Sequence, residues 1–137
     1  MSSVAQDLLL TGIRNNSNDW RKRLGQLRQQ PSSWARTADL QQAIELLVAG
    51  DHEKRVLAIE VQRQLIKENA TSMPTEAAIQ LRQRLIELLA ATGYRKVARL
   101  ELQWLETVAA ASENARVSAK AIKTVVALYE RFTWLAD

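Results

Sequence analysis

Apolar residues recur along most of the chain at the spacing of an α-helix. One stripe follows positions i, i+3, i+4, i+7 and i+8 and consists of Leu40, Ala43, Ile44, Leu47 and Val48. Comparable stripes fall within residues 51–69, 78–89, 97–108 and 117–132. No run of six residues alternates between apolar and polar positions with β-branched enrichment, so the pattern predicts helices and no strands.

The first third of the chain is less regular. A short helix is expected around residues 3–13 and a second around 18–29, where Trp20, Leu24 and Leu27 form the apolar side. We expect Trp20 to anchor this second helix to the core while its arginines point outward. The segments "NNSN" and "QQPSSWARTA" are typical of turns.

Short turns with a glycine separate the later helices. Gly50 is expected to end one helix and Asp51 to cap the next, Gly93 is expected to end another, and Ser112 is expected to cap the last helix. Helices joined by such short turns pack as antiparallel hairpins. The sequence therefore predicts an all-α fold of six or seven antiparallel helices. We expect one helical domain over residues 1–137, with a basic, less regular segment at 1–38.

Two stretches of the sequence are similar to each other. "IELLVAGDHEKRVLAIEVQ" at 44–62 aligns with "IELLAATGYRKVARLELQ" at 86–103, an offset typical of helical-hairpin repeats. Asp51, Arg55, Val56 and Ala58 give residues 38–110 a resemblance to HEAT and armadillo-type repeats. The resemblance implies a short α-solenoid whose surface binds other macromolecules. The alternative is a non-repetitive helical bundle, since amphipathic helices of similar composition resemble one another.

The net charge of +4 is concentrated near the N-terminus. Six of the nineteen lysines and arginines, but only two of the fifteen acidic residues, lie in residues 1–38. Basic side chains neutralise phosphates or meet acidic protein surfaces, but a solvated helix face with a core tryptophan is the favoured interpretation. The candidate contact residues are Arg14, Arg21, Lys22, Arg23, Arg28 and Arg36.

Two tryptophans stand apart from the main apolar stripes. Trp34 lies within the basic segment, and Trp134 lies beside Phe132 near the end of the sequence. Tryptophan combines a large apolar surface with a polar N–H group, which suits it to interfaces. Trp34 and Trp134 are therefore candidate residues for docking a partner, with closure of the last helix as the alternative for Trp134.

The sequence is poor in residues that carry chemistry. It contains no cysteine and a single histidine, His52, so neither a zinc site nor a thiolate nucleophile is expected. Its four glycines are isolated and form no phosphate-binding loop. Glu53 and Glu60 share a helix face, where we expect them to be solvated. These features predict no enzyme, no cofactor and no small-molecule substrate.

Three functional hypotheses follow from these observations. The first is a non-catalytic helical interaction module, a small subunit or adaptor that binds another protein in a larger assembly. The second is a helical subunit that contacts the phosphates of DNA or RNA through its basic segment, as in a ribonucleoprotein effector complex. The third is a small inhibitor or regulator of one enzyme. Without cysteine and without a long apolar segment, the chain is expected in the cytoplasm, with no membrane partner.

Overall fold

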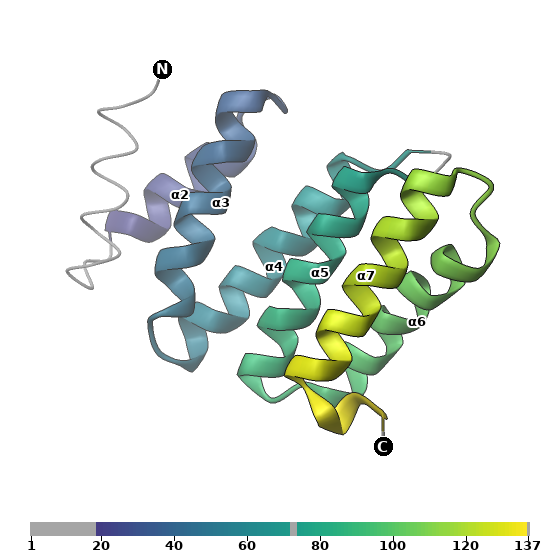
Figure 1. Cartoon of the computed structure of the whole chain (residues 1–137). Coiled ribbons are helices and arrows are strands. Elements are labelled where there is room, and N and C mark those ends of the chain that lie inside the picture. Colours follow the sequence, from purple (N-terminus) through teal and green to yellow (C-terminus); the bar gives the residue numbers. More distant parts are fainter. Residues whose placement is uncertain (1–18, 72–73, 137) are drawn as a thin grey trace. The chain divides into compact units, whose positions relative to one another are not determined.

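The described chain is built from α-helices. The structure is a computed structural model that describes residues 19–71 and 74–136. Within these ranges it contains six α-helices, one terminal 3-10 helix and no strand, which confirms the predicted all-α class (Figure 1). The elements are α2 (Asp19–Gln29), α3 (Trp34–Val48), α4 (His52–Glu68), α5 (Glu76–Thr92), α6 (Arg95–Ala111), α7 (Ala115–Arg131) and η1 (Thr133–Ala136). Arg14 and the helix expected at 3–13 lie outside the described residues.

Residue contacts divide the chain into two compact units. The first covers residues 1–62 and the second residues 63–137, with the boundary inside α4. The described part of the first unit holds α2, α3 and the start of α4. The second holds the end of α4, the three helices α5 to α7, and η1. The expectation of a single domain stays a prediction.

In the first unit, the apolar stripes of the helices face a common core. Trp20 and Leu24 of α2 are each 2% exposed, so Trp20 does anchor this helix. Helix α3 buries Leu40, Ile44 and Leu47 along its predicted stripe. Burial of such side chains stabilises the fold by roughly 1.5–3 kcal/mol each.

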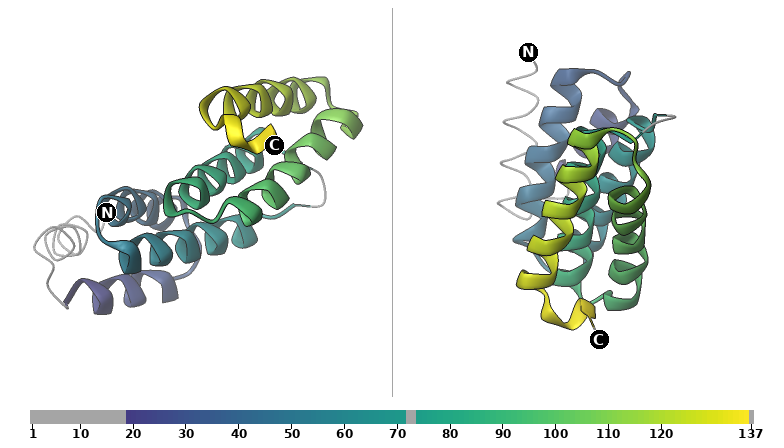
Figure 2. Two further views of the ribbon diagram at one scale, coloured as in Figure 1. Left: turned by 90° about the horizontal axis from the view of Figure 1, so that it is seen from below. Right: turned by 45° about the vertical axis from the view of Figure 1, so that its right-hand side comes forward.

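The second unit is organised around three long helices. Helix α6 packs against both α5 and α7, and α5 also contacts α7. The left panel of Figure 2 shows α5 and α7 side by side, with α6 below them. The final turn η1 folds back onto α6 and α7, and it buries Leu135. The fully buried core of these helices includes Leu85, Ile86, Leu88, Leu102 and Leu105.

Side-chain caps define several helix starts. Asp51 accepts a hydrogen bond from the backbone N–H of Lys54 at 3.1 Å, as predicted. At the start of α7, Asn114 accepts bonds from two backbone N–H groups. The expectation that Ser112 caps this helix was wrong. Ser112 is the C-cap residue of α6 instead, because the connecting turn extends two residues further along the chain.

The two similar stretches lie at corresponding places in the helix order. Each covers the end of one helix, a turn with a glycine and the first part of the next helix, in the hairpins α3–α4 and α5–α6. Their turns differ in conformation. Gly93 adopts a left-handed φ of 93°, as C-cap glycines commonly do, whereas α3 ends on a right-handed Ala49 before Gly50. The resemblance to HEAT and armadillo repeats stays a prediction.

Candidate interaction surface

A groove in the first unit runs between α2 and α4. Its volume is about 590 Å³, which lies within the range of ligand-binding clefts. The half-buried Val56 and Leu57, together with Leu24 and Gly25, give it an apolar floor. The other lining residues are Arg21, Arg28, His52, Glu53 and Glu60. We call this feature the α2–α4 groove.

The two walls of the groove carry opposite charges. Arg21 and Arg28, two helical turns apart, belong to α2, whereas Glu53 and Glu60, also two turns apart, belong to α4. Arg21 forms an ion pair with Glu53, and its guanidinium lies 5.3 Å from the centre of the Trp20 ring. The Arg21 and Glu53 side chains are 52% and 67% exposed, so solvent screens this pair strongly.

The basic residues of α2 do not form one patch. Arg21 and Arg28 line the groove, while Lys22 and Arg23 are exposed and do not line it. Successive residues of an α-helix are rotated by about 100° around its axis. Lys22 and Arg23 therefore point away from the groove side of α2 and also in different directions from each other. Cations spread around a helix cannot all face one nucleic-acid backbone.

The prediction that Arg36 contacts phosphates or an acidic partner was wrong. Arg36 is only 2% exposed, so it is not an accessible contact for phosphate or an acidic partner. Its guanidinium donates hydrogen bonds to the carbonyl oxygens of Leu27 at 3.1 Å and Arg28 at 2.8 Å. These carbonyls belong to the last turn of α2, where a cation also complements the helix dipole. Arg36 therefore fastens α2 to α3.

The first unit as a whole is less basic than its N-terminal segment. Residues 1–62 contain eight basic and seven acidic residues, a net charge of +1, against +4 for residues 1–38 alone. Five of the seven acidic residues come from α3, α4 and the turn between them, and Glu53 and Glu60 among them face the same groove as Arg21 and Arg28. The first unit therefore presents a mixed surface in place of the basic one that the linear sequence indicates.

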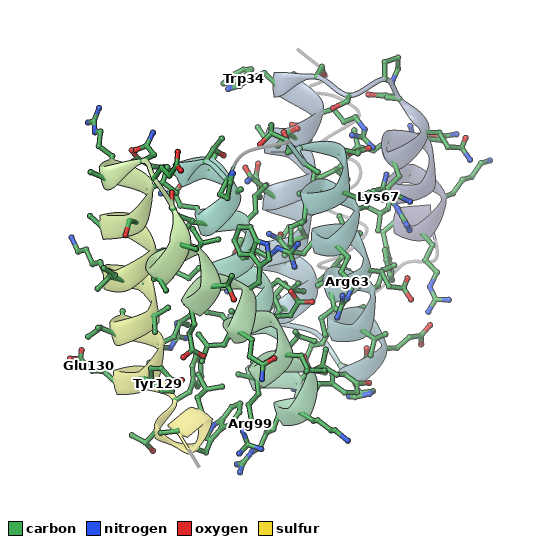
Figure 3. All side chains as sticks on the ribbon, turned by 90° about the vertical axis from the view of Figure 1, so that its right-hand side faces the viewer. Trp34, Arg63, Lys67, Arg99, Tyr129 and Glu130 are labelled. Atoms are coloured by element: carbon green, nitrogen blue, oxygen red, sulfur yellow. The ribbon has the colours of Figure 1, made fainter. Side chains whose placement is uncertain are left out.

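Trp34 is the most exposed large apolar side chain in the described chain. It opens α3 and is 84% exposed, and Figure 3 shows it pointing away from the ribbon. The backbone beneath it is well defined, because Ser33 caps the helix by accepting a bond from the Arg36 N–H at 3.2 Å. A capped helix start thus holds an indole in solvent, and its role in docking a partner stays a prediction.

Trp134 is placed differently from Trp34. The guanidinium groups of Arg95 and Arg99 lie 4.9 and 5.8 Å from its ring centre, and Arg99 donates a hydrogen bond to its carbonyl oxygen at 2.9 Å. The ring also lies 6.0 Å from that of Phe132. The half-buried Trp134 thus fastens η1 to the start of α6, as in the alternative of helix closure, and its role in docking stays a prediction.

The groove residues other than the two arginines were not predicted as site residues. Gly25 offered a usable signal, because a glycine inside a helix is unfavourable and needs a reason. His52 lines the groove as well, and it is exposed. Among the residues in the described ranges, no three His, Asp or Glu side chains converge in a way that could hold a metal ion.

Comparisons with known proteins identify no relative. No family model matches the chain, and neither curated proteins nor solved structures show a significant match. Within the described parts of the chain, no helix is long and apolar enough to cross a membrane.

Proposed function

We propose that the protein is a non-catalytic interaction module whose first unit binds a partner protein in a larger assembly. The observation that carries the proposal is the 84% exposure of Trp34 on a capped helix start. A fully buried tryptophan removes roughly 150–250 Å² from water, and tryptophan is enriched among the residues that dominate binding energy. Leaving such a surface in solvent is unfavourable for the isolated chain, and a partner would remove that cost.

The charge distribution supports a protein partner over a nucleic acid. The first unit has a net charge of only +1, and two carboxylates of α4 line its groove. Carboxylates repel phosphates, and non-specific nucleic-acid binding depends on several cations that contact the backbone together. Protein interfaces, in contrast, commonly place charges of both signs around an apolar centre.

A quantitative pull-down tests this proposal. The full chain, its Trp34→Ala variant and a Leu100→Ala control are used as bait in native lysate, and each captured protein is measured by mass spectrometry. Leu100 is a suitable control because it is 58% exposed and lies on α6 in the second unit. We expect a captured protein whose yield falls about tenfold with Trp34→Ala and is unchanged with Leu100→Ala.

Two results would contradict the proposal. Equal capture by the wild type and Trp34→Ala would show that Trp34 is not the anchor. A gel shift with RNA or DNA at low salt that weakens steeply with added salt would favour the nucleic-acid hypothesis. In that case, changing Arg21, Lys22 and Arg23 together to Glu should abolish the shift.

A further inference from the structure

The α2–α4 groove has the features of a binding site for one helix of a partner. This inference rests on the proposed function and names the kind of partner. We propose that the groove binds a single amphipathic α-helix of a partner protein. The apolar face of that helix covers the floor at Val56 and Leu57. Its acidic flank faces α2 and its basic flank faces α4.

The floor of the groove favours a closely packed occupant. Val56 and Leu57 are only half-buried, so part of their apolar surface faces the open groove. An amphipathic helix laid into an apolar groove is a recurrent mode of recognition, with anchors at i, i+3, i+4 and i+7. Covering these side chains would complete a burial that the first unit leaves partial.

Gly25 is the second observation that indicates an occupant. It lies inside α2, where glycine is less stable than alanine by roughly 1 kcal/mol. Its φ is not positive, and a Cβ atom at this position would meet nothing within 4 Å. Neither backbone conformation nor internal packing therefore requires glycine here. A missing side chain on a groove floor allows another backbone to approach closely.

The charges of the walls define the flanks of the bound helix. Arg21 and Arg28 on α2 are seven residues apart, and so are Glu53 and Glu60 on α4, so the two walls carry their charges at matching intervals. The two charges on each wall are therefore about 10.5 Å apart along the helix axis. A partner helix presents side chains at the same distance when they stand at positions i and i+7. The Arg21–Glu53 pair is exposed at the groove, so exchanging it for pairs with the partner costs little.

The test uses three fluorescein-labelled helical peptides of about 18 residues and measures anisotropy with the full chain. All three carry leucines at i, i+4, i+7 and i+11. The mixed peptide has glutamates on one flank and lysines on the other, and the two controls have glutamates or lysines on both flanks. We expect the mixed peptide to bind about tenfold more tightly than either control, since only it satisfies both walls.

Two variants of the chain separate groove binding from general attraction. Gly25→Leu fills the floor without removing any contact of the fold, and it should weaken binding of the mixed peptide about tenfold. Gln26→Leu is the matched control, because it adds the same side chain to an exposed position of α2 that does not line the groove. Circular dichroism should show that both variants keep the helical content of the wild type.

The alternative outcomes each overturn the inference in a recognisable way. Equal binding by the mixed and all-glutamate peptides would attribute the signal to the net positive charge of the chain. Failure of all three peptides, or unchanged binding by Gly25→Leu, would exclude a partner helix from the groove. A dimer in sedimentation that Gly25→Leu converts to a monomer would assign the groove to a second copy. If Trp34-dependent capture persists in these cases, the groove inference fails alone and the proposed function stands.

Discussion

The two units use the same kinds of side chains in different ways. In the second unit, several arginines are held by carboxylates and aromatic rings: Glu101 bridges Arg63 and Arg82, and Glu87 bridges Arg84 and Arg131, whereas the Arg116–Glu76 pair is exposed. The Glu101 and Glu87 side chains are only 13% and 17% exposed. In the first unit, the Arg21–Glu53 pair is largely exposed, and Trp34 is uncovered.

This difference separates scaffold from surface. A guanidinium held between a half-buried carboxylate and a ring, as Arg82 is by Glu101 and Trp104, joins neighbouring helices of its own chain. An exposed pair contributes little to stability and stays available for exchange with a partner. We therefore propose that exposure, more than residue type, marks the surface that binds a partner. The experiments below test that interpretation through folding stability.

The largest contrast is expected between Trp134 and Trp34. Replacing Trp134 by Ala removes the ring from Arg95 and Arg99, and it should lower the free energy of unfolding by about 2–3 kcal/mol. Trp34→Ala should change it by less than about 0.5 kcal/mol, because the side chain is already solvated. Urea unfolding followed by circular dichroism measures both values. Equal losses would refute the distinction between scaffold and surface tryptophans.

A second contrast concerns the basic residues of the first unit. Arg36→Met keeps the apolar stem of the side chain but removes its bonds to the carbonyls of Leu27 and Arg28. We expect a loss of about 2 kcal/mol from these buried, charge-assisted bonds, against almost none for the exposed Arg23→Met. The measurement is again urea unfolding. If Arg36→Met is as stable as the wild type, its capping role is excluded.

The ion pairs provide a smaller contrast. Glu101→Gln leaves two arginines without their shared carboxylate and should cost about 1 kcal/mol, whereas Glu53→Gln should cost less than about 0.5 kcal/mol. High salt should narrow the difference only slightly, because the Glu101 side chain is mostly shielded from solvent. Urea unfolding of both variants in low and high salt measures this difference in the free energy of unfolding. A difference that disappears in salt would mean that Glu101 behaves as a surface charge.

The helices of this chain were predictable because local pattern determines them. Each long apolar stripe from Leu40 onward corresponds to an observed helix, since helical spacing and core burial require the same residues. Boundaries were less accurate. Residues 34–38 were expected in a turn but are helical, and the cap of α7 is Asn114 in place of Ser112. Neighbouring polar residues offer similar caps, and only the path of the chain selects one.

The candidate site was only partly predictable, because exposure depends on distant residues. Trp34 and Trp134 were both candidate docking residues, yet the Trp134 ring lies against Arg99, which is 35 residues away in the sequence. Arg36 looked like its basic neighbours until α3 placed it under the end of α2. The acidic wall of the groove belongs to α4 and the basic wall to α2, so only the fold brings the two walls together. Sequence supplied the residue types, whereas folding decided which of them face solvent.

The smallest expected effect is a shift in the titration of Tyr129, which couples α7 to α6. Burial raises the pKa of the Tyr129 phenol, and the negative charge of Glu106 and a 3.3 Å hydrogen bond to its carboxylate raise it further. Because the folded pKa exceeds the unfolded one, this stabilisation is complete below about pH 10 and is lost as pH rises through the folded pKa.

Glu106→Gln keeps an acceptor but removes the charge, so the pKa of Tyr129 should fall. Absorbance at the tyrosinate band in a Tyr94→Phe background measures it, since Tyr94 is the only other tyrosine. An unchanged pKa would show that the charge of Glu106 does not affect Tyr129, and that this contact between α6 and α7 resembles the exposed contacts of the first unit.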